Sequence, residues 1–341
     1  MTPSWKQRPE GGGRFALWLI RNIASHGGRA LGRALLLPIT LYFMVVRGPE
    51  RRESRAYLAR VLPAPPRLWD VARHIHTFAS TILDRVFMLT GQMQRFQVDV
   101  QGIDELHAAL DRGRGVLLFG SHLGSFDSLR ALSRARPDVK VRVLLDKAHN
   151  PAMTEVLDAL NPELAAGIID AGQDGPSIVL AIKQAADEGA LVALMVDRAR
   201  PGEPSLATPF LGANAAFPIA PWLIAAALKV PVVLAFGLYR GGNRYDLVFE
   251  NFSEGIEIPR QQRATLLAAL IRGYAARLEH YTRLAPYNWF NFFDFWNIAN
   301  ASPANASPVH ASPANAQAPC RVDAPAADPG VQHGSAIRRG G

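Results

Sequence analysis

Residues 115–134 read Gly-Val-Leu-Leu-Phe-Gly-Ser-His-Leu-Gly-Ser-Phe-Asp-Ser-Leu-Arg-Ala-Leu-Ser-Arg. The apolar run from Val116 to Phe119 has the length and the β-branched and aromatic content of a buried strand. Gly120 and Ser121 break this run, and apolar residues then recur every three positions from Phe126 to Leu132, as in a helix. The stretch therefore predicts a strand, a tight turn and a helix.

Two polar residues, His122 and Asp127, lie at the predicted turn and in the first turn of the predicted helix. A carboxylate in that first turn is favoured by the helix dipole and is able to reach back to the histidine ring. An imidazole held in one tautomer by an acid is the basic unit for deprotonating a hydroxyl. His122 is therefore our candidate general base and Asp127 the acid that orients it. The alternative is a turn histidine and a capping aspartate with no catalytic role.

The length of 341 residues suits one large domain with appendages or two small domains. The single cysteine, Cys320, excludes a disulfide framework and a cysteine-based metal site. His74 and His76 are two positions apart on a predicted helix and so do not share a face, which argues against a histidine metal site there. We expect no metal and no bound cofactor.

The net charge of +8 is concentrated at the N-terminus. Residues 1–60 contain eleven lysines and arginines against three glutamates, which is the whole excess. A nucleic-acid-binding domain carries its basic face within the fold, so this distribution argues against nucleic acid as a partner. It favours contact with an anionic membrane surface.

Two apolar runs, at 15–20 and 34–46, accompany this charge, and three arginines interrupt them: Arg21, Arg29 and Arg33. The second run has 13 residues, fewer than the ~20 that span a bilayer as a helix. We expect one or two helices that lie in the membrane interface with the arginines toward lipid phosphates. The alternative is a helical hairpin packed on the rest of the protein.

Strands and helices alternate through the remainder of the chain, which predicts an α/β fold with a mostly parallel sheet flanked by helices. We expect a membrane-anchoring region at 1–60, a domain at 61–297, and a disordered Ala/Ser/Pro-rich tail at 298–341 in which Ala-Ser-Pro-Ala-Asn-Ala occurs twice. The predicted strands are 116–119, 139–145, 167–170, 190–196 and an antiparallel pair at 231–239 and 244–250; the further predicted helices are 68–91, 151–160, 177–188, 218–229 and 260–284.

Residues 197–218 form a second informative stretch, rich in Pro and Gly and without regular periodicity. We expect a long functional loop whose rim offers Arg198 and Arg200 to an anionic group. Asp197, like His122, directly follows a predicted strand. Ligands bind beyond the carboxyl ends of parallel strands, so both residues are expected at that edge. The alternative is a solvated loop with local ion pairs.

Seven aromatic residues occur between Pro286 and Trp296. Two interpretations stay open for them: an interfacial aromatic belt near a substrate entrance, and a segment that caps the core.

The segment His-Leu-Gly-Ser-Phe-Asp at 122–127 resembles the His-x4-Asp block of the lysophospholipid acyltransferase superfamily, and in particular its bacterial lipid A late-acyltransferase branch. Phe-Leu-Gly at 210–212 and Ala-x-Phe-Pro at 215–218 resemble later blocks of that branch, which shape the acceptor site and acyl pocket. The resemblance implies that the site is lined by residues Phe210, Gly212, Phe217 and Pro218. The chain departs from the pattern at Arg198, where the branch usually has Gln, and it lacks the Phe-Pro-Glu-Gly of glycerolipid relatives.

The resemblance implies a membrane-associated acyltransferase on the cytoplasmic face of a bacterial inner membrane. Its donor would be a thioester on acyl carrier protein or coenzyme A, and its acceptor a hydroxyl of a lipid or amphipathic molecule. Backbone N–H groups at Gly124 and Ser125 are expected to stabilise the oxyanion. Two other classes stay open: a non-catalytic lipid-binding or assembly protein, and a serine hydrolase using Ser121 or Ser125. The absence of G-x-S-x-G argues against the hydrolase.

Overall fold

The computed structural model describes residues 28–129, 136, 138–148, 150–199, 202–297 and 302–303. All of these belong to one compact unit that covers residues 1–304. The first apolar run, Arg200, Cys320 and almost all of the predicted tail lie outside the described residues.

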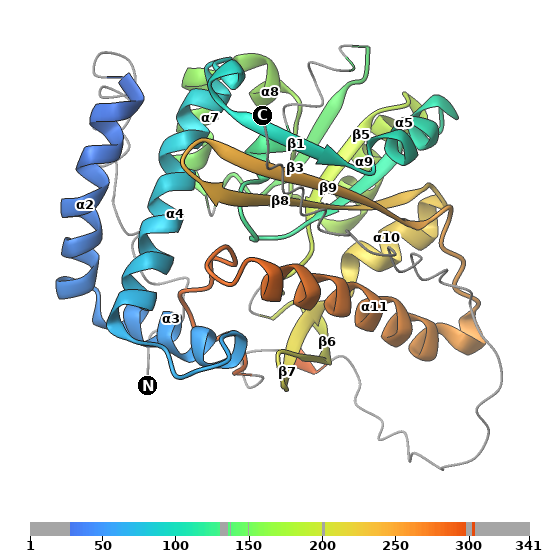
Figure 1. Ribbon diagram of the computed structural model, residues 1–341. Helices are drawn as coiled ribbons and strands as arrows, with labels where there is room; N and C mark the ends of the chain where they lie inside the picture. Colours follow the sequence, from blue (N-terminus) through green and yellow to red (C-terminus); the bar gives the residue numbers. More distant parts are fainter. Residues whose placement is uncertain are drawn as a thin grey trace, which may run out of the picture. The chain divides into compact units, whose positions relative to one another are not determined.

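A seven-stranded sheet forms the centre of this unit, in the order β1-β9-β8-β2-β5-β3-β4. Every neighbouring pair is parallel except β8 and β9, which form the predicted antiparallel hairpin. The predicted α/β fold is confirmed (Figure 1). The strands are β1 (Gln97–Gln101), β2 (Val116–Gly120), β3 (Val141–Leu145), β4 (Ile168–Asp170), β5 (Leu191–Met195), β8 (Val232–Gly241) and β9 (Arg244–Ser253).

Helices cover both faces of the sheet because its central strands are apolar on both sides. The helices are α5 (Ile103–Asp111), α7 (Pro151–Leu160), α8 (Pro162–Ala166), α9 (Gly175–Asp187), α10 (Ala220–Leu228) and α11 (Arg263–Leu284), and the short 3₁₀ turns are η3 (Met93–Arg95), η4 (Phe126–Leu129) and η5 (Arg260–Gln262). Alternate residues of β2 face opposite sides of the sheet: Leu117 and Phe119 pack with α9, α10 and α11, whereas Val116 and Leu118 pack with α5.

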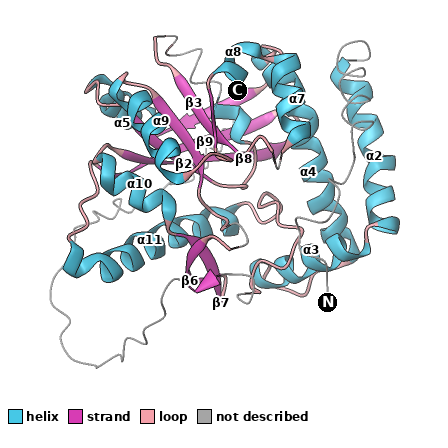
Figure 2. Ribbon diagram, turned by 180° about the vertical axis from the view of Figure 1, so that it is seen from behind, coloured by secondary structure: helices cyan, strands magenta, loops and turns pink. Residues whose placement is uncertain are grey.

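Three helices precede the sheet: α2 (Gly28–Val46), α3 (Gly48–Val61) and α4 (Leu68–Leu89). In both ribbon views α2 lies alongside α4 (Figures 1 and 2). Leu36 of α2 is buried against Leu83 and Phe87 of α4. By length and composition, α2 is the one helix among the described residues that is long and apolar enough to cross a membrane. Only 17% of its most apolar stretch is buried inside the protein.

The arginines of α2 were expected to face lipid phosphates, but they face the body of the protein. Arg29 pairs with the buried Asp84 of α4 at 2.8 Å, and Arg33 donates to the carbonyl of Gly242 at 2.9 Å and to the hydroxyl of Tyr239. Both therefore fix α2 to the body of the protein. The opposite side of the helix exposes apolar side chains, namely Leu31, Leu37, Leu41, Tyr42, Val45 and Val46.

The expected long loop after Asp197 is largely a β-hairpin, which corrects our prediction. β6 (Pro204–Phe210) pairs antiparallel with β7 (Ala213–Pro218). Leu211 and Gly212 connect them with positive φ angles of 49° and 79°, the two-residue turn that suits strand twist. A leucine is unusual there; its N–H is held by the Glu279 carboxylate of α11 at 2.6 Å. The hairpin projects beyond α11, away from the large sheet (Figure 2).

The aromatic segment 286–296 caps the core, which decides between its two interpretations. Trp289, Phe290 and Phe295 are each at most 8% exposed. Of the predicted tail, the structure describes only Ser302–Pro303, a short strand β10 parallel to β6.

Candidate active site

His122 lies just beyond the carboxyl end of β2, and Asp197 lies just beyond the end of β5. The two strands are parallel neighbours in which Gly120 pairs with Met195. Nδ1 of His122 is 2.8 Å from Oδ1 of Asp197, and the backbone N–H of His122 donates to Oδ2 at 3.1 Å. Strand polarity thus brings the two residues together at the expected edge of the sheet.

The contact with Asp197 fixes the tautomer of the histidine. A carboxylate only accepts hydrogen bonds, so Nδ1 of the neutral ring carries the hydrogen and Nε2 keeps its lone pair. Within the described part of the chain, no protein group is hydrogen-bonded to Nε2, and the side chain is 38% exposed. Nε2 is therefore placed to accept a proton from a bound hydroxyl.

Asp197 is fully buried and is held by three side chains. Besides His122, the indole Nε1 of Trp289 donates to Oδ2 at 3.1 Å, and Nε of Arg198 lies 3.5 Å from Oδ2. Burial opposes ionisation, but the charge and hydrogen bonds of His122 and the charge of Arg198 outweigh it, so the pKa of Asp197 lies well below its ordinary value. The acid is ionised throughout the physiological range.

The pKa of His122 is lowered from its ordinary value of 6.5. Desolvation of the ring is the main cause, and the positive charges of Arg198 and Arg85 add to it. Asp197 acts in the opposite direction without overcoming them. A lowered pKa keeps the imidazole neutral at pH 7, which is the form that accepts a proton.

The segment 288–290 runs along the backbone on both sides of His122. The N–H of Phe290 donates to the carbonyl of His122 at 3.0 Å, and the N–H of Gly124 donates to the carbonyl of Asn288 at 2.8 Å. Together with the bond from the His122 N–H to Asp197, these contacts hold the histidine backbone in place.

Asp127 does not occupy the expected position on His122. The 3₁₀ turn η4 places its carboxylate beside α4, where Nε of Arg85 donates to Oδ2 at 2.5 Å. The hydrogen bond of the His122 ring to a carboxylate goes to Asp197. The carboxylate that contacts the His122 ring thus comes from the residue after the neighbouring strand β5 and not from the acid five residues along the chain.

The expected oxyanion donors are also engaged elsewhere. The N–H of Gly124 is bonded to the carbonyl of Asn288, and the N–H of Ser125 donates to the carbonyl of Gly237 at 2.7 Å. Gly124 has a φ of 71°, and a Cβ there would collide with the carbonyl of Gly237. These two residues therefore fix the turn after β2 against β8 and are not free to bind an oxyanion.

Arg198 was expected on an exposed rim and is instead largely buried, with its side chain 20% exposed. Its Nη2 donates to the carbonyl of Phe290 at 2.5 Å, and its guanidinium lies over the rings of Trp289 and Phe293. The geometry makes it part of the support for Asp197. Arg200 lies outside the described residues.

The residues matched to the later family blocks lie in and around the hairpin. Phe210 and Phe217 are fully buried, and the ring of Phe210 packs edge-on against that of Trp289 at 5.1 Å between centroids. Pro218 ends β7, and Gly212 occupies the turn. These aromatic rings support the tryptophan that holds Asp197; a role for the four residues in lining an acyl pocket stays a prediction.

Sequence reasoning missed Trp289 and His74 as parts of this site. His74 of α4 is fully buried, and its Nε2 donates to the carbonyl of Trp289 at 3.0 Å while Nδ1 lies 2.8 Å from the hydroxyl of Ser54. The aromatic run at 286–296 was the available signal for Trp289, but its contact with Asp197 spans 92 positions.

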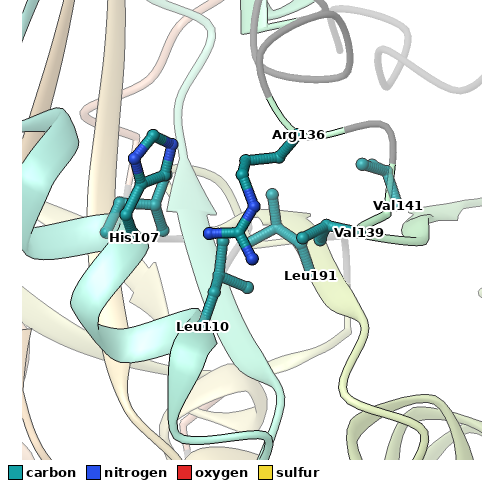
Figure 3. Close-up of a pocket in the computed structure, with 7 residues that line it drawn as sticks. His107, Leu110, Arg136, Val139, Val141 and Leu191 are labelled. Atoms are coloured by element: carbon teal, nitrogen blue, oxygen red, sulfur yellow. The ribbon is translucent and has the colours of Figure 1, made fainter.

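A small pocket is found at the opposite ends of the strands. It is lined by Leu106, His107, Leu110, Arg136, Val139, Val141 and Leu191. Val141 and Leu191 begin β3 and β5, so this pocket is remote from His122. Figure 3 shows the Arg136 guanidinium lying between His107 and Leu191; it is paired with Asp111 and Asp138. Among the described residues, no group of three His, Cys, Asp or Glu is arranged to hold a metal ion.

The model of the bacterial lipid A biosynthesis acyltransferases matches residues 50–272 of the chain, which includes both His122 and Asp197. The chain belongs to this family. As a lipid A biosynthesis acyltransferase it is an acyl-transferring enzyme, and the prediction made from the His-x4-Asp and later blocks is confirmed. A search of curated proteins found no match to the chain.

Proposed function

We propose that the enzyme transfers a fatty acyl group from a thioester donor to a hydroxyl of a membrane lipid, with His122 as general base and Asp197 as its orienting acid. The observation that carries this proposal is the 2.8 Å bond from Nδ1 to the buried carboxylate, which leaves Nε2 with its lone pair on a partly exposed ring. Family membership supports acyl transfer in lipid A-type biosynthesis.

In the proposed reaction, Nε2 of His122 accepts the proton of the acceptor hydroxyl as its oxygen attacks the thioester carbonyl. A C–O bond forms and the C–S bond breaks. The protonated imidazole then returns its proton to the departing thiolate, which leaves as a thiol. Asp197 stays ionised and stabilises the transient imidazolium, as an acid behind a catalytic histidine does. The reaction proceeds in one displacement without an acyl-enzyme.

The site does not favour the hydrolase alternative. Ser125 is 1% exposed and its hydroxyl contacts the sulfur of Met88, and Ser121 is 4% exposed. Neither hydroxyl is hydrogen-bonded to His122 in the described part of the chain. A nucleophilic serine needs the histidine within hydrogen-bond reach and an open path to substrate.

We propose that α2 holds the enzyme on an anionic membrane surface, at the cytoplasmic face of the inner membrane. Its outward side presents Leu37 and Leu41, which are 67% and 64% exposed, while its arginines bind the protein body. An apolar helix face fixed parallel to a supporting helix suits insertion into the lipid interface. In this proposal α2 holds the sheet near lipid acceptors, and no spanning helix is required.

The test of this function is acyl transfer by the purified enzyme in lipid vesicles that contain a lipid A-type acceptor. Long-chain acyl carrier protein and acyl-coenzyme A serve as parallel donors, and products are read by mass spectrometry. We expect an ester product with one donor or both, and its loss in His122→Ala. Release of free fatty acid at the same rate with and without acceptor would instead indicate a hydrolase.

A further inference from the structure

We infer that Arg85 binds a substrate phosphate beside His122, and that Asp127 serves by holding Arg85 in place. This inference rests on the proposed function, because it assigns a substrate contact at the same site. It gives Asp127 a role through the arginine rather than on the histidine.

Arg85 uses its Nε for an ion pair and leaves its terminal nitrogens without a protein oxygen among the described residues. Its Nε binds Asp127, and its Nη1 lies 3.7 Å from the sulfur of Met153. By contrast, Arg29 uses Nε and Nη2 in a two-pronged pair with Asp84, and Nη2 also donates to the carbonyl of Gly242. The terminal donors of Arg85 are therefore available to a ligand, whereas those of Arg29 are used within the protein.

The surroundings of Arg85 place those donors at the reacting edge of the sheet. Asp127 follows His122 by five residues, and Met153 lies in the first turn of α7, which follows the carboxyl end of β3. The charge of Arg85 also acts on the His122 ring, where it lowers the pKa. The Arg85 side chain is 21% exposed, so part of it is accessible to solvent.

Phosphate is the ligand that this arrangement fits. A guanidinium held through Nε presents its terminal N–H groups as a planar fork, which matches two oxygens of a phosphate. Two substrates of the proposed reaction carry such a group: the phosphopantetheine arm of the donor and a phosphorylated lipid acceptor. The donor and the acceptor would both offer a phosphate to Arg85, and the KM values for donor and acceptor, measured separately, distinguish the two.

The experiment compares wild type with Arg85→Ala, Arg85→Lys, Asp127→Asn and the double variant Arg85→Ala/Asp127→Asn, varying donor and acceptor separately. The donor pair is acyl-coenzyme A and the acyl N-acetylcysteamine thioester, which has no phosphate. The acceptor pair is a lipid A-type lipid before and after phosphatase treatment. Arg29→Met is the matched control, because it breaks another arginine ion pair on α4.

We expect Arg85→Ala to raise KM for one phosphorylated substrate by about 10- to 150-fold, the effect of a lost charge-assisted hydrogen bond. The rise should vanish with the phosphate-free partner of that pair and be smaller in Arg85→Lys. The double variant should show no larger KM than Arg85→Ala, since Asp127 acts only through the arginine. Arg29→Met should change the melting temperature and leave both KM values unchanged.

Unchanged KM values for all four substrates in a folded Arg85→Ala enzyme would overturn the inference. So would a loss of kcat in Asp127→Asn that adds to that of Arg85→Ala, because Asp127 would then act on His122. The same assay tests the proposed function separately. That function is contradicted if His122→Ala keeps full turnover, regardless of the KM values of the Arg85 variants.

Discussion

Nδ1 of His122 and Oδ1 of Asp197 lie 2.8 Å apart although 75 positions separate the two residues in the chain. The contact exists because β2 and β5 are parallel neighbours that end at the same level. Around it, two side chains fix the carboxylate: Trp289, from the segment after α11, and Arg198, the residue that follows Asp197. The His122 ring is thus oriented by a residue distant in the sequence and not by Asp127.

Replacing Arg198 should move the pH dependence of acyl transfer. Its positive charge lowers the pKa of His122, so Arg198→Met should raise that pKa and shift the acid limb of kcat/KM to higher pH. Arg198→Lys keeps the charge and should leave the limb nearer to that of wild type. An acid limb unmoved in Arg198→Met would show that the arginine does not act electrostatically on the base.

Replacing Trp289 by Phe should remove one hydrogen bond to Asp197 while keeping most of the packing. A hydrogen bond to a charged group contributes about 1.5–3 kcal/mol, so we expect kcat to fall by about tenfold or more. Trp296→Phe is the matched control, because its indole N–H donates to the carbonyl of Phe210 and not to the site. Equal kcat values for the two variants would remove Trp289 from the catalytic support.

His74 should make the fold sensitive to acid. Burial lowers its pKa from 6.5 to about 4, so between these values the unfolded chain binds a proton that the folded protein does not. Stability should therefore fall as pH drops from 6.5 to 4, by about 3 kcal/mol for this group. Chemical unfolding as a function of pH measures the slope, which should be shallower in His74→Gln. A slope that is identical in both proteins would assign the acid sensitivity to other groups.

Polar substitutions on α2 should release the enzyme from membranes. Leu37→Gln/Leu41→Gln removes two exposed apolar side chains without disturbing the buried Leu36. Flotation with anionic vesicles should show a several-fold loss of binding, while high salt alone releases wild type only in part. Leu180→Gln changes an equally exposed leucine on α9 and should bind as wild type does. Unchanged flotation of the double variant would place the anchor elsewhere.

Patterns of apolar residues predicted the sheet because buried parallel strands such as Leu191–Met195 need unbroken apolar runs. They also placed His122 and Asp197 at one edge. The hairpin at 204–218 was not predicted, since its three prolines and its Leu211-Gly212 turn do not resemble a strand pair with an Asn-Gly turn. The partner of His122 was misassigned because η4 turns Asp127 toward Arg85, and that pairing depends on where α4 packs.

The most direct test of the account compares single-turnover acyl transfer by His122→Ala, Asp197→Asn and Asp127→Asn at saturating substrates, with circular dichroism to show that each is folded. We predict that His122→Ala and Asp197→Asn each lose about 10²- to 10⁴-fold in rate, as expected for loss of a base or of its correct tautomer. Asp127→Asn should stay within a few-fold of wild type under saturation. The reverse order, with Asp127→Asn as impaired as His122→Ala and Asp197→Asn near wild type, would contradict the assignment of Asp197 as the orienting acid.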